Sequence, residues 1–479
     1  MSELPNNWTT ARLGDLAEDI SYGYTAPSTR EKVGPHLLRI TDIQENEVLW
    51  KTVPYCEIDS EQANKYLLKE NDLVFARTGA TVGKSFLIRG EIPDAIFASY
   101  LIRVRCMRPE AAGYLSLYFR SQDYWRQITG FSAGIGQPNV NGSKLKELVI
   151  PLPPLAEQTR IAAKLDELLA QVDTLKARID GIPALLKRFR QSVLTAAVSA
   201  QLTEEWRVKN TNYSNIDMNP KAKYLSTEEL ASAEELLRKP LPSSWEKYAL
   251  EQLVEAERGI PYGIVQTGVA VSEGVPTVRC GDIKSLCIDT SDLKIVSPDI
   301  EQDYKRTRLK GGEVLLAIRG SVGNAGVASE SLRNCNISRE VAMIPTLPSV
   351  LPLYLAYLLQ SPIGQRLLVS KVRGVAQKGI NLADVKRLPV ALPPYEEQNE
   401  IVFRVEQFFA YADQLQAKVD AARKRVDQMT QSILAKAFRG ELVPQDPSDE
   451  PANVLLDRIK AQRTAVPNAK RGRRSVMAC

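Results

Sequence analysis

Two glycine-rich segments contain residue types that could bind a phosphate group. RTGATVGKS spans residues 77–85, and a related stretch, AIRGSVGNA, spans residues 317–325. A phosphate-binding loop requires a glycine five positions before Gly83, but Thr78 stands there and Gly79 is one residue too close. The second stretch also lacks the lysine that such a loop uses. Both stretches therefore predict a glycine-rich turn between strands and not an ATP site.

The tetrapeptide LPPY at residues 392–395 is similar to the NPPY motif of adenine methyltransferases. That motif needs Asn or Asp at its first position to bind the target amine, and Leu392 has no group that can do so. The related segment at residues 152–155 reads LPPL. Paired prolines suit a helix start, and Glu157 and Glu397 then fall in a first turn, where the helix dipole favours acidic side chains. We therefore interpret both segments as helix starts and predict no catalytic residue.

The single histidine and the scattered cysteines limit metal and hydrolase chemistry. His36 is the only histidine, and the cysteines at positions 56, 106, 280, 287, 335 and 479 never form a Cys-x-x-Cys pair. Zinc sites use clustered Cys and His ligands, and most catalytic triads use histidine. We therefore expect no metal site, no disulfide framework and no triad-type active site.

The composition indicates a folded protein of several domains. The chain has 479 residues, of which 44% are hydrophobic and 25% charged, and its net charge is +5. At roughly 150 residues per domain, this length allows about two to four domains. The sequence lacks a run of about 18 apolar residues, and MSELPNNW at its start lacks the layout of a signal peptide. We expect a cytoplasmic protein without a membrane span. The charge is compatible with nucleic-acid binding but too small to indicate it.

The sequence repeats itself over a long distance. PLPPLAEQTRI at 151–161 returns as ALPPYEEQNEI at 391–401, and QSVLTAAVSAQL at 191–202 returns as QSILAKAFRGEL at 431–442. Both pairs are offset by 240 residues, whereas LPNNW at 4–8 returns as LPSSW at 241–245, offset by 237. This period is far longer than that of a solenoid repeat, so the chain contains two copies of a whole module.

Each module divides into an α+β part and a helical part. Short apolar runs at 73–77, 86–90, 100–106 and 147–153 predict strands, and residues 113–128 predict a helix. The expected organisation is two similar α+β domains at 1–153 and 241–393, two helical spacers at 154–202 and 394–442, a linker with a short helix at 203–240, and a partly disordered, basic C-terminal tail at 443–479.

The helical parts carry a heptad pattern, in which apolar residues alternate spacings of four and three. The predicted coiled-coil seam comprises Ile161, Leu165, Leu168, Val172 and Leu175 in the first copy, and Ile401, Val405, Phe408, Leu415, Val419 and Val426 in the second. Pro183 should kink or break the first helix, whereas Arg423 at the matching position should not. Two long helices that pack only on their own domains remain an alternative.

Two similar modules tend to pack as a pseudo-dimer, and a two-fold axis would make the long helices antiparallel. The predicted fold is therefore an α+β pseudo-two-fold repeat, with two similar domains separated by two long antiparallel coiled-coil helices. Such an object suits duplex DNA, on which two half-sites can be met from one face. Three base pairs read by one domain give about 3–9 kcal/mol of discrimination, which is marginal against the roughly 8 kcal/mol needed to reject about a million competing sites.

Glycine-rich loops supply the candidates for DNA contact. SAGIGQPNVNGSK at 132–144 corresponds to RGVAQKGINLADVK at 373–386, and the stretches at 77–85 and 317–325 form a second pair. Asn and Gln side chains can form paired hydrogen bonds with adenine, and Arg and Lys side chains can bind guanine or phosphate. The candidates are Arg77, Thr78, Lys84, Gln137, Asn139, Asn141, Lys144, Arg319, Gln377, Lys378 and Asn381.

The same loop residues have structural alternatives. The pairs Gln137/Gln377 and Asn141/Asn381 are identical in both copies and could instead cap the following turn. Residues that read different half-sites should differ between the copies. Arg39 and Arg279 are further candidates, and a salt bridge to Asp42 or Asp282 is an equal alternative for each.

The helical segments carry a resemblance to a known family. These segments are IPLPPLAEQTRIAAKLDELLAQVD (150–173), LLKRFRQSVLTAAVSAQLTEEWR (185–207), LPPYEEQNEIVFRVEQFFAYAD (392–413) and QSILAKAFRGEL (431–442). The chain resembles the specificity subunit of type I restriction–modification systems, and the sequences of its helical segments are most similar to the type IA branch. The resemblance covers nearly the whole chain; it is specific in the helices and weak in the α+β domains.

The resemblance implies a DNA specificity subunit that is not itself an enzyme. The α+β domains would be target-recognition domains that read the two halves of a bipartite, asymmetric site, and the coiled coil would fix the gap. The implied partners are double-stranded DNA, two modification (methyltransferase) subunits and two restriction subunits that translocate and cut DNA. S-adenosylmethionine, ATP and Mg²⁺ would belong to those subunits and none to this chain. A single-chain adenine-N6 DNA methyltransferase and an orphan DNA-binding scaffold are the alternatives.

Overall fold

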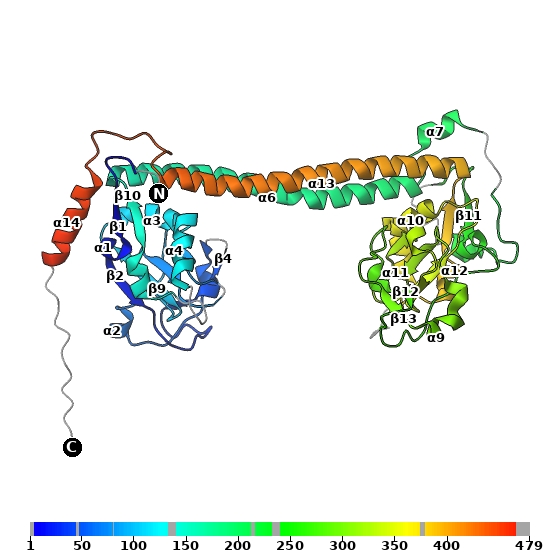
Figure 1. Cartoon of the computed structure of the whole chain (residues 1–479), viewed down its shortest axis with the longest axis horizontal. Helices are drawn as coiled ribbons and strands as arrows, with labels where there is room; N and C mark the ends of the chain where they lie inside the picture. Colours follow the sequence, from blue (N-terminus) through cyan, green and yellow to red (C-terminus); the bar gives the residue numbers. More distant parts are fainter. Residues whose placement is uncertain are drawn as a thin grey trace, which may run out of the picture. The chain divides into compact units, whose positions relative to one another are not determined.

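The chain folds into two compact units, which Figure 1 shows in a computed structural model. Unit 1 comprises residues 1–180 and 421–479, and unit 2 comprises residues 181–420. The structure describes residues 4–44, 47–79, 81–132, 140–211, 216–231, 240–373 and 379–465. Each unit therefore combines one α+β domain with parts of two long helices.

Unit 1 is built around an antiparallel sheet of four strands in the order β2-β9-β6-β7. Its strands are β1 (Thr9–Arg12), β2 (Ala17–Tyr22), β3 (His36–Leu38), β4 (Ile43–Gln44), β5 (Glu47–Val48), β6 (Leu73–Ala76), β7 (Ser85–Leu87), β8 (Ala95–Phe97), β9 (Leu101–Cys106) and β10 (Val149–Leu152). Its short helices are α1 (Leu13–Leu16), η1 (Ile40–Asp42), η2 (Trp50–Thr52), α2 (Ser60–Ala63), η3 (Pro109–Ala111), α3 (Ala112–Tyr118), α4 (Gln122–Ser132) and α5 (Gly142–Glu147). Every residue of β6 is buried, as its continuous apolar sequence requires.

Unit 2 repeats this plan with a sheet in the order β15-β14-β17 and a second sheet in the order β13-β12-β16. Its strands are β11 (Glu246–Ala249), β12 (Val275–Val278), β13 (Lys294–Val296), β14 (Val314–Ala317), β15 (Ala325–Val327), β16 (Asn336–Ile337), β17 (Val341–Ile344) and β18 (Pro389–Leu392). Its short helices are α7 (Glu204–Lys209), η4 (Leu250–Leu253), η5 (Cys280–Asp282), α9 (Pro298–Glu301), η6 (Gln302–Thr307), η7 (Glu330–Leu332), α10 (Pro352–Gln360), α11 (Pro362–Ser370) and α12 (Leu382–Lys386).

Strand register confirms the repeat at the level of single residues. Tyr22 pairs with Ile102 and Tyr24 with Ala98 in unit 1, and the pairs Tyr262–Ala342 and Ile264–Ser338 in unit 2 lie 240 positions later. The strand that opens each domain also pairs antiparallel with the strand that closes it, as β1–β10 and β11–β18. The predicted fold of two similar α+β domains is therefore confirmed.

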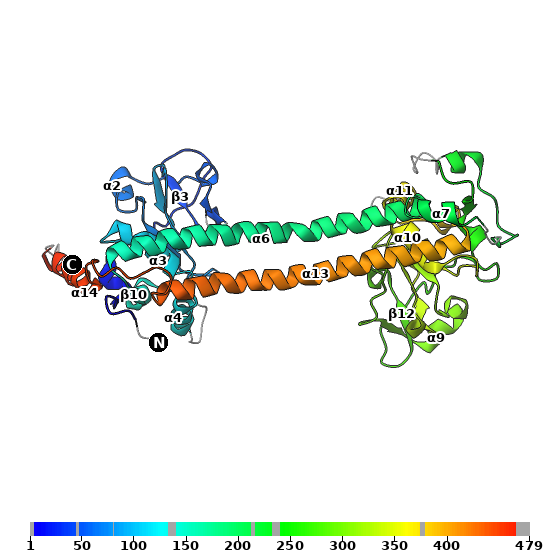
Figure 2. The same ribbon diagram turned by 90° about the horizontal axis from the view of Figure 1, so that it is seen from above.

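The two long helices, α6 (Leu155–Val198) and α13 (Tyr395–Phe438), contain 44 residues each. In unit 1 the start of α6 and the end of α13 share one apolar core, and Figure 2 shows them side by side. In unit 2 the end of α6 shares a core with the start of α13. The helices therefore run antiparallel in each unit, as predicted.

Burial varies along the predicted seam. The side chains of Ile161, Leu165, Val172, Ile401, Val405 and Val426 are buried, whereas Leu168, Leu415 and Val419 are half-buried. Leu175 and Phe408 are 45% and 40% exposed. Leu169, which the heptad pattern does not include, is buried in the core of unit 1. The seam is thus well packed near the domains and more open elsewhere.

Pro183 was predicted to kink or break the first helix; it lies inside α6 without ending it, so the predicted break is wrong and the kink stays a prediction. An interior proline costs about 3 kcal/mol because it removes a hydrogen bond and crowds the preceding turn. The proline side chain is exposed, and Leu186 and Val193 beyond it are buried. Packing of the apolar face offsets that cost.

The helix predicted at residues 113–128 is two helices, α3 and α4, separated at residues 119–121. Ser121 starts the second helix, because its side-chain oxygen accepts a hydrogen bond from Tyr124 N at 3.2 Å. Ser361 does the same in unit 2, where it accepts from Gly364 N at 3.0 Å. A buried N-cap serine therefore overrides the continuous helical pattern.

The segment predicted as a C-terminal tail contains a packed helix, α14 (Ala452–Ala465). Its residues Leu455, Leu456 and Ile459 are buried in the core of unit 1, so the tail interpretation is wrong for this part. The amphipathic spacing of these three residues on one helix face explains the packing. The basic residues 470–474 lie outside the described residues, and so does most of the helix predicted at 226–239.

Candidate nucleic-acid interface

Three segments of unit 1 meet where strand β6 ends. Arg77 N donates a hydrogen bond to Tyr100 O at 2.9 Å, and Val140 N donates to Arg77 O at 3.1 Å. These bonds join the loop at 77–84 to the turn before β9 and to the segment before α5. The two glycine-rich loops named by the sequence are therefore neighbours.

Tyr22 connects these segments through its side chain. The Arg77 guanidinium lies 5.1 Å from the centre of the Tyr22 ring, and Gly142 N donates to the Tyr22 hydroxyl at 2.9 Å. Tyr22 is 42% exposed and Tyr100 is 63% exposed. Thr78 and Lys84 are also exposed. The surface thus presents aromatic rings beside polar and cationic groups, which suits stacking and phosphate contact.

Unit 2 builds the same arrangement with equivalent backbone hydrogen bonds. Ile318 N donates to Glu340 O at 2.8 Å, and Ile380 N donates to Ile318 O at 2.9 Å. Arg319 also forms a β-bridge with Gly379. The two glycine-rich loops therefore meet in unit 2 as well.

The hydrogen bonds define which loop residues correspond. Ile318 occupies the position of Arg77, so Arg319 corresponds to Thr78. Ala76 N donates to Lys84 O in unit 1, and Ala317 N donates to Asn324 O in unit 2, both at 2.8 Å, so Asn324 corresponds to Lys84.

A shared glycine holds each turn in shape. Gly83 and Gly323 have φ angles of +83° and +93°, a left-handed conformation that favours glycine. A side-chain carbon added at Gly83 would lie 2.8 Å from the Ile128 side chain. The Val-Gly pair common to both loops is therefore a requirement of the turn.

The two candidate asparagines differ in their contacts. Asn141 starts α5, and its side-chain oxygen accepts from Lys144 N at 2.9 Å. Asn381 stands at the start of α12 but makes no side-chain cap bond, and it is exposed. The capping interpretation thus holds for Asn141 and not for Asn381. Gln137, Asn139, Gln377 and Lys378 lie outside the described residues.

Arg39 and Arg279 are held in ion pairs. Arg39 contacts Asp42 at 2.8 Å, and Arg279 contacts Asp282 at 3.3 Å. The hydrogen bond that Arg39 donates to Asp42 raises the pKa of Arg39, and the bond that Arg279 donates to Asp282 does the same for Arg279. Both arginines serve the fold through these pairs.

Sequence reasoning did not single out Tyr22, which lies in this surface of unit 1, or Tyr262, the equivalent residue of unit 2. SYGYT at 21–25 and PYGIV at 261–265 are offset by 240 residues, so the signal was present in the repeat. The glycine after each tyrosine is required by a close approach, because an added carbon at Gly23 would lie 2.2 Å from Ala98 O and one at Gly263 would lie 1.8 Å from Ile337 O. Tyr262 is 48% exposed.

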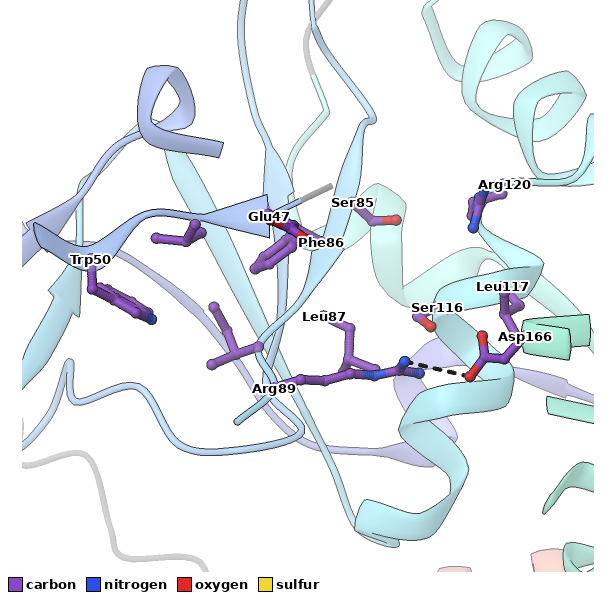
Figure 3. A pocket seen from close by; sticks show the side chains of 12 residues that line it. Glu47, Trp50, Ser85, Phe86, Leu87, Arg89, Ser116, Leu117, Arg120 and Asp166 are labelled. Atoms are coloured by element: carbon purple, nitrogen blue, oxygen red, sulfur yellow. Dashed lines mark hydrogen bonds and ion pairs between the residues drawn. The ribbon is translucent and has the colours of Figure 1, made fainter. Parts of the chain in front are cut away.

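A cavity of about 320 Å³ lies where the domain of unit 1 meets α6 (Figure 3). Trp50 and Phe86 contribute aromatic walls, and Arg89 and Asp166 form an ion pair at 3.5 Å. None of the candidate DNA-contact residues lines this cavity. The ion pair therefore links the domain to the long helix.

The described residues show neither a metal-binding cluster nor a membrane-spanning helix. No group of three or more His, Cys, Asp or Glu side chains there is arranged to hold a metal ion. No helix in the described part of the chain has the length and apolar character needed to cross a membrane.

Comparison with known proteins identifies the family. The model for the type I restriction modification DNA specificity domain matches residues 5–184 and 242–422, once in each repeat. The chain belongs to this family. It is 39% identical over 366 residues to the type I restriction enzyme EcoBI specificity subunit of Escherichia coli, covering 74% of this chain and 73% of that protein. It is 35% identical over 386 residues to the EcoKI specificity subunit of Escherichia coli K12, covering 77% and 76%.

Solved structures of the family share the fold. A chain from a structure of a type I R-M system matches with a TM-score of 0.65 at 23% identity, covering 92% of this chain and 100% of that chain. The HsdS subunit from Thermoanaerobacter tengcongensis matches with a TM-score of 0.56 at 23% identity, covering 92% and 98%. The present chain is thus a DNA sequence-specificity subunit of a type I restriction–modification system, as its helices predicted.

Proposed function

We propose that each unit of this specificity subunit reads one half of a bipartite, asymmetric DNA site. The observation that carries the proposal is the repeated surface. Equivalent backbone hydrogen bonds join the same three segments in both units, while the exposed side chains differ, as at Thr78 and Arg319. A common scaffold with different reading groups is what two unlike half-sites require.

The proposed DNA contacts are the loop residues that the sequence singled out. They are Arg77, Thr78, Lys84, Gln137, Asn139, Asn141, Lys144, Arg319, Gln377, Lys378 and Asn381, with Tyr22 and Tyr100 added from the geometry. Asn141 contributes chiefly by holding its turn, since its side-chain oxygen is already bonded.

In this proposal the domains at 1–153 and 241–393 are the target-recognition domains, and the helical spacers at 154–202 and 394–442 set the unread gap. By the α-helical rise, a helix of this length extends about 66 Å. The linker at 203–240 and the segment at 443–479 follow the two spacers.

The chain itself is proposed to be non-catalytic. Two modification subunits would supply S-adenosylmethionine chemistry, and two restriction subunits would supply ATP- and Mg²⁺-dependent translocation and cleavage. The support is the family, together with the absence of an intact NPPY motif at residues 392–395.

The test is to map DNA methylation in cells that express this chain with its modification subunit and in cells that lack this chain. We expect methylated adenines in one bipartite motif, present only when both proteins are present. Incubation of the isolated chain with labelled S-adenosylmethionine and DNA should give no methyl transfer. Transfer by the chain alone, or a continuous motif without a gap, would contradict the proposal.

A further inference from the structure

Resting on the proposed function, we infer that Arg319 and Glu340 determine the base preference of unit 2, and that Thr78 and Tyr100 are their counterparts in unit 1. The pairs are matched by hydrogen bonds and not by sequence alone. Tyr100 O accepts from Arg77 N, and Glu340 O accepts from Ile318 N, the residue at the same position.

Arg319 is placed to read a base edge. Its side chain is exposed at the end of β14, and its backbone is fixed by the bridge to Gly379. Two nearby arginines are already engaged, since Arg279 contacts Asp282 and Arg373 contacts Asp384. Arg319 has no ion pair among the described residues of its unit. An exposed guanidinium on a fixed backbone is the common reader of guanine.

Glu340 supplies a complementary acceptor beside Arg319. Its carboxylate accepts from the Cys280 thiol at 3.0 Å, and a thiol is a weak donor that a stronger one can replace. The Cys280 sulfur also lies 2.8 Å from the position of a side-chain carbon added at Gly320. Arg319, Glu340 and Cys280 therefore belong to one patch, in which a carboxylate could accept from the amino group of cytosine.

Unit 1 presents different chemistry at the same positions. Thr78 carries a short hydroxyl side chain where Arg319 carries a guanidinium, and Tyr100 carries an exposed aromatic ring where Glu340 carries a carboxylate. By contrast, Tyr22 and Tyr262 are identical and both exposed. The shared tyrosines are therefore expected to contact a feature that both half-sites have in common. The residues that differ between the units are expected to contact the bases that differ between the half-sites.

The test uses the complex of the full chain with its modification subunits and a duplex library that varies each position of the site found for the wild-type chain. Replacing Arg319 with threonine (R319T) should reduce discrimination at one base pair of one half-site by about 10–100-fold, the value of one bidentate contact. Preference in the other half-site should not change. R333T is the matched control, because Arg333 is an exposed arginine paired with Glu330, and it should leave both halves unchanged.

R319K separates specificity from folding and charge. Lysine keeps the cation but lacks the planar fork of the guanidinium, so R319K should weaken discrimination at the same base pair while the salt dependence of binding stays the same. Unchanged preference at every position in R319T or R319K, or a loss that is equal for all sequences, would overturn the inference. If the wild-type complex shows no bipartite site, the proposed function fails instead, and the two failures are thereby distinguished.

Discussion

At the scale of single residues, the two long helices end on matched left-handed residues. Ala200 follows α6 with φ +62°, and Gly440 follows α13 with φ +78°. A side-chain carbon at Gly440 would lie 2.4 Å from the Pro5 side chain, whereas Ala200 already accommodates one and is buried. Ala200 therefore forms this turn with backbone strain, whereas Gly440 forms the same turn without it.

We predict that G440A lowers the free energy of unfolding of unit 1 by about 2–4 kcal/mol, from the left-handed strain and the clash together. A200G should change unit 2 by at most about 1 kcal/mol, because relief of strain opposes the loss of a buried methyl group. Urea unfolding with hydrogen exchange to assign each unit measures both values. Equal losses in the two variants would contradict this account.

A buried carboxylate anchors the first turn of each long helix. Trp8 donates to Glu157 at 3.1 Å in unit 1, and Trp245 donates to Glu397 at 2.9 Å in unit 2. Their other partners differ: Glu157 accepts from the neutral side chain of Gln445, whereas Glu397 accepts from Thr203 and from the cation of Arg207. The carboxylate of unit 1 accepts from the neutral donors Trp8 and Gln445, and burial raises the pKa of Glu157.

E397Q should therefore destabilise its unit by about 3–5 kcal/mol, because it leaves the Arg207 guanidinium without its counter-charge. E157Q should lower the free energy of unfolding of its unit by about 1–2 kcal/mol, since the neutral donors Trp8 and Gln445 lose only part of their hydrogen bonding to this side chain. Chemical denaturation of both variants checks the order. A larger loss for E157Q than for E397Q would show that the cation is unimportant.

Residue identity alone could not predict these differences. Asn141 and Asn381 are identical in sequence and both have an extended backbone, yet only the side chain of Asn141 caps its helix. The repeat indicated which residues correspond. It could not indicate which side chains remain exposed, since that depends on contacts from distant segments such as the one carrying Tyr22.

At the scale of elements, the segments that follow the two long helices cover equivalent parts of their domains. In unit 1, Arg463 donates to Gly14 O; in unit 2, Asn219 N donates to Gln252 O at 2.7 Å, in the turn that follows the equivalent opening strand. The first covering segment is α14, and the second is the part of the linker at 216–231. The sequence could not predict that these two segments cover equivalent parts of their domains, because their amino-acid sequences are not similar.

We predict that α14 is required for the stability of unit 1. L455A should lower its free energy of unfolding by about 2–5 kcal/mol, through lost burial and the cavity left behind. V454A on the same helix is the control and should have little effect, because Val454 is 43% exposed. Hydrogen exchange should show the change in unit 1; equal effects of both variants would mean that α14 is not docked.

The linker is held to unit 2 by a pH-sensitive ion pair. Arg387 contacts Glu229 and lowers the pKa of that carboxyl to about 2, from an ordinary value of 4.5. Because the folded-state pKa is depressed, this stabilisation is complete above about pH 4.5 and is lost as the pH falls toward 2. The protection of residues 216–231 against hydrogen exchange, relative to the intrinsic exchange rate at each pH, should therefore fall across that window. In E229Q the exchange should already be raised at neutral pH; an identical pH profile in E229Q would exclude this pair as the cause.

At the scale of the whole molecule, the two-fold packing expected of the repeated modules predicted the antiparallel pairing, and the heptad pattern predicted the seam but not its uneven packing. The open positions, such as Leu175, are flanked by charged contacts: Lys176 with Asp427 at 3.1 Å, and Asp180 with Arg423 at 3.3 Å. These pairs fix which turns of α6 and α13 lie opposite each other in unit 1. Charge complementarity therefore supports the register where apolar burial is weak.

This register allows a direct test of the spacer proposal. Insertion of one heptad after Arg178 in α6 and one after Lys424 in α13 lengthens both helices by about 10 Å and keeps the seam in phase. At about 3.4 Å per base pair, the unread gap of the methylated motif should widen by about three base pairs, while both half-sites stay the same. Insertion in one helix alone is the control and should abolish methylation, because the paired charges then fall out of register. A gap that keeps its length in the doubly extended chain would mean that the long helices do not set the spacing of the two reading surfaces.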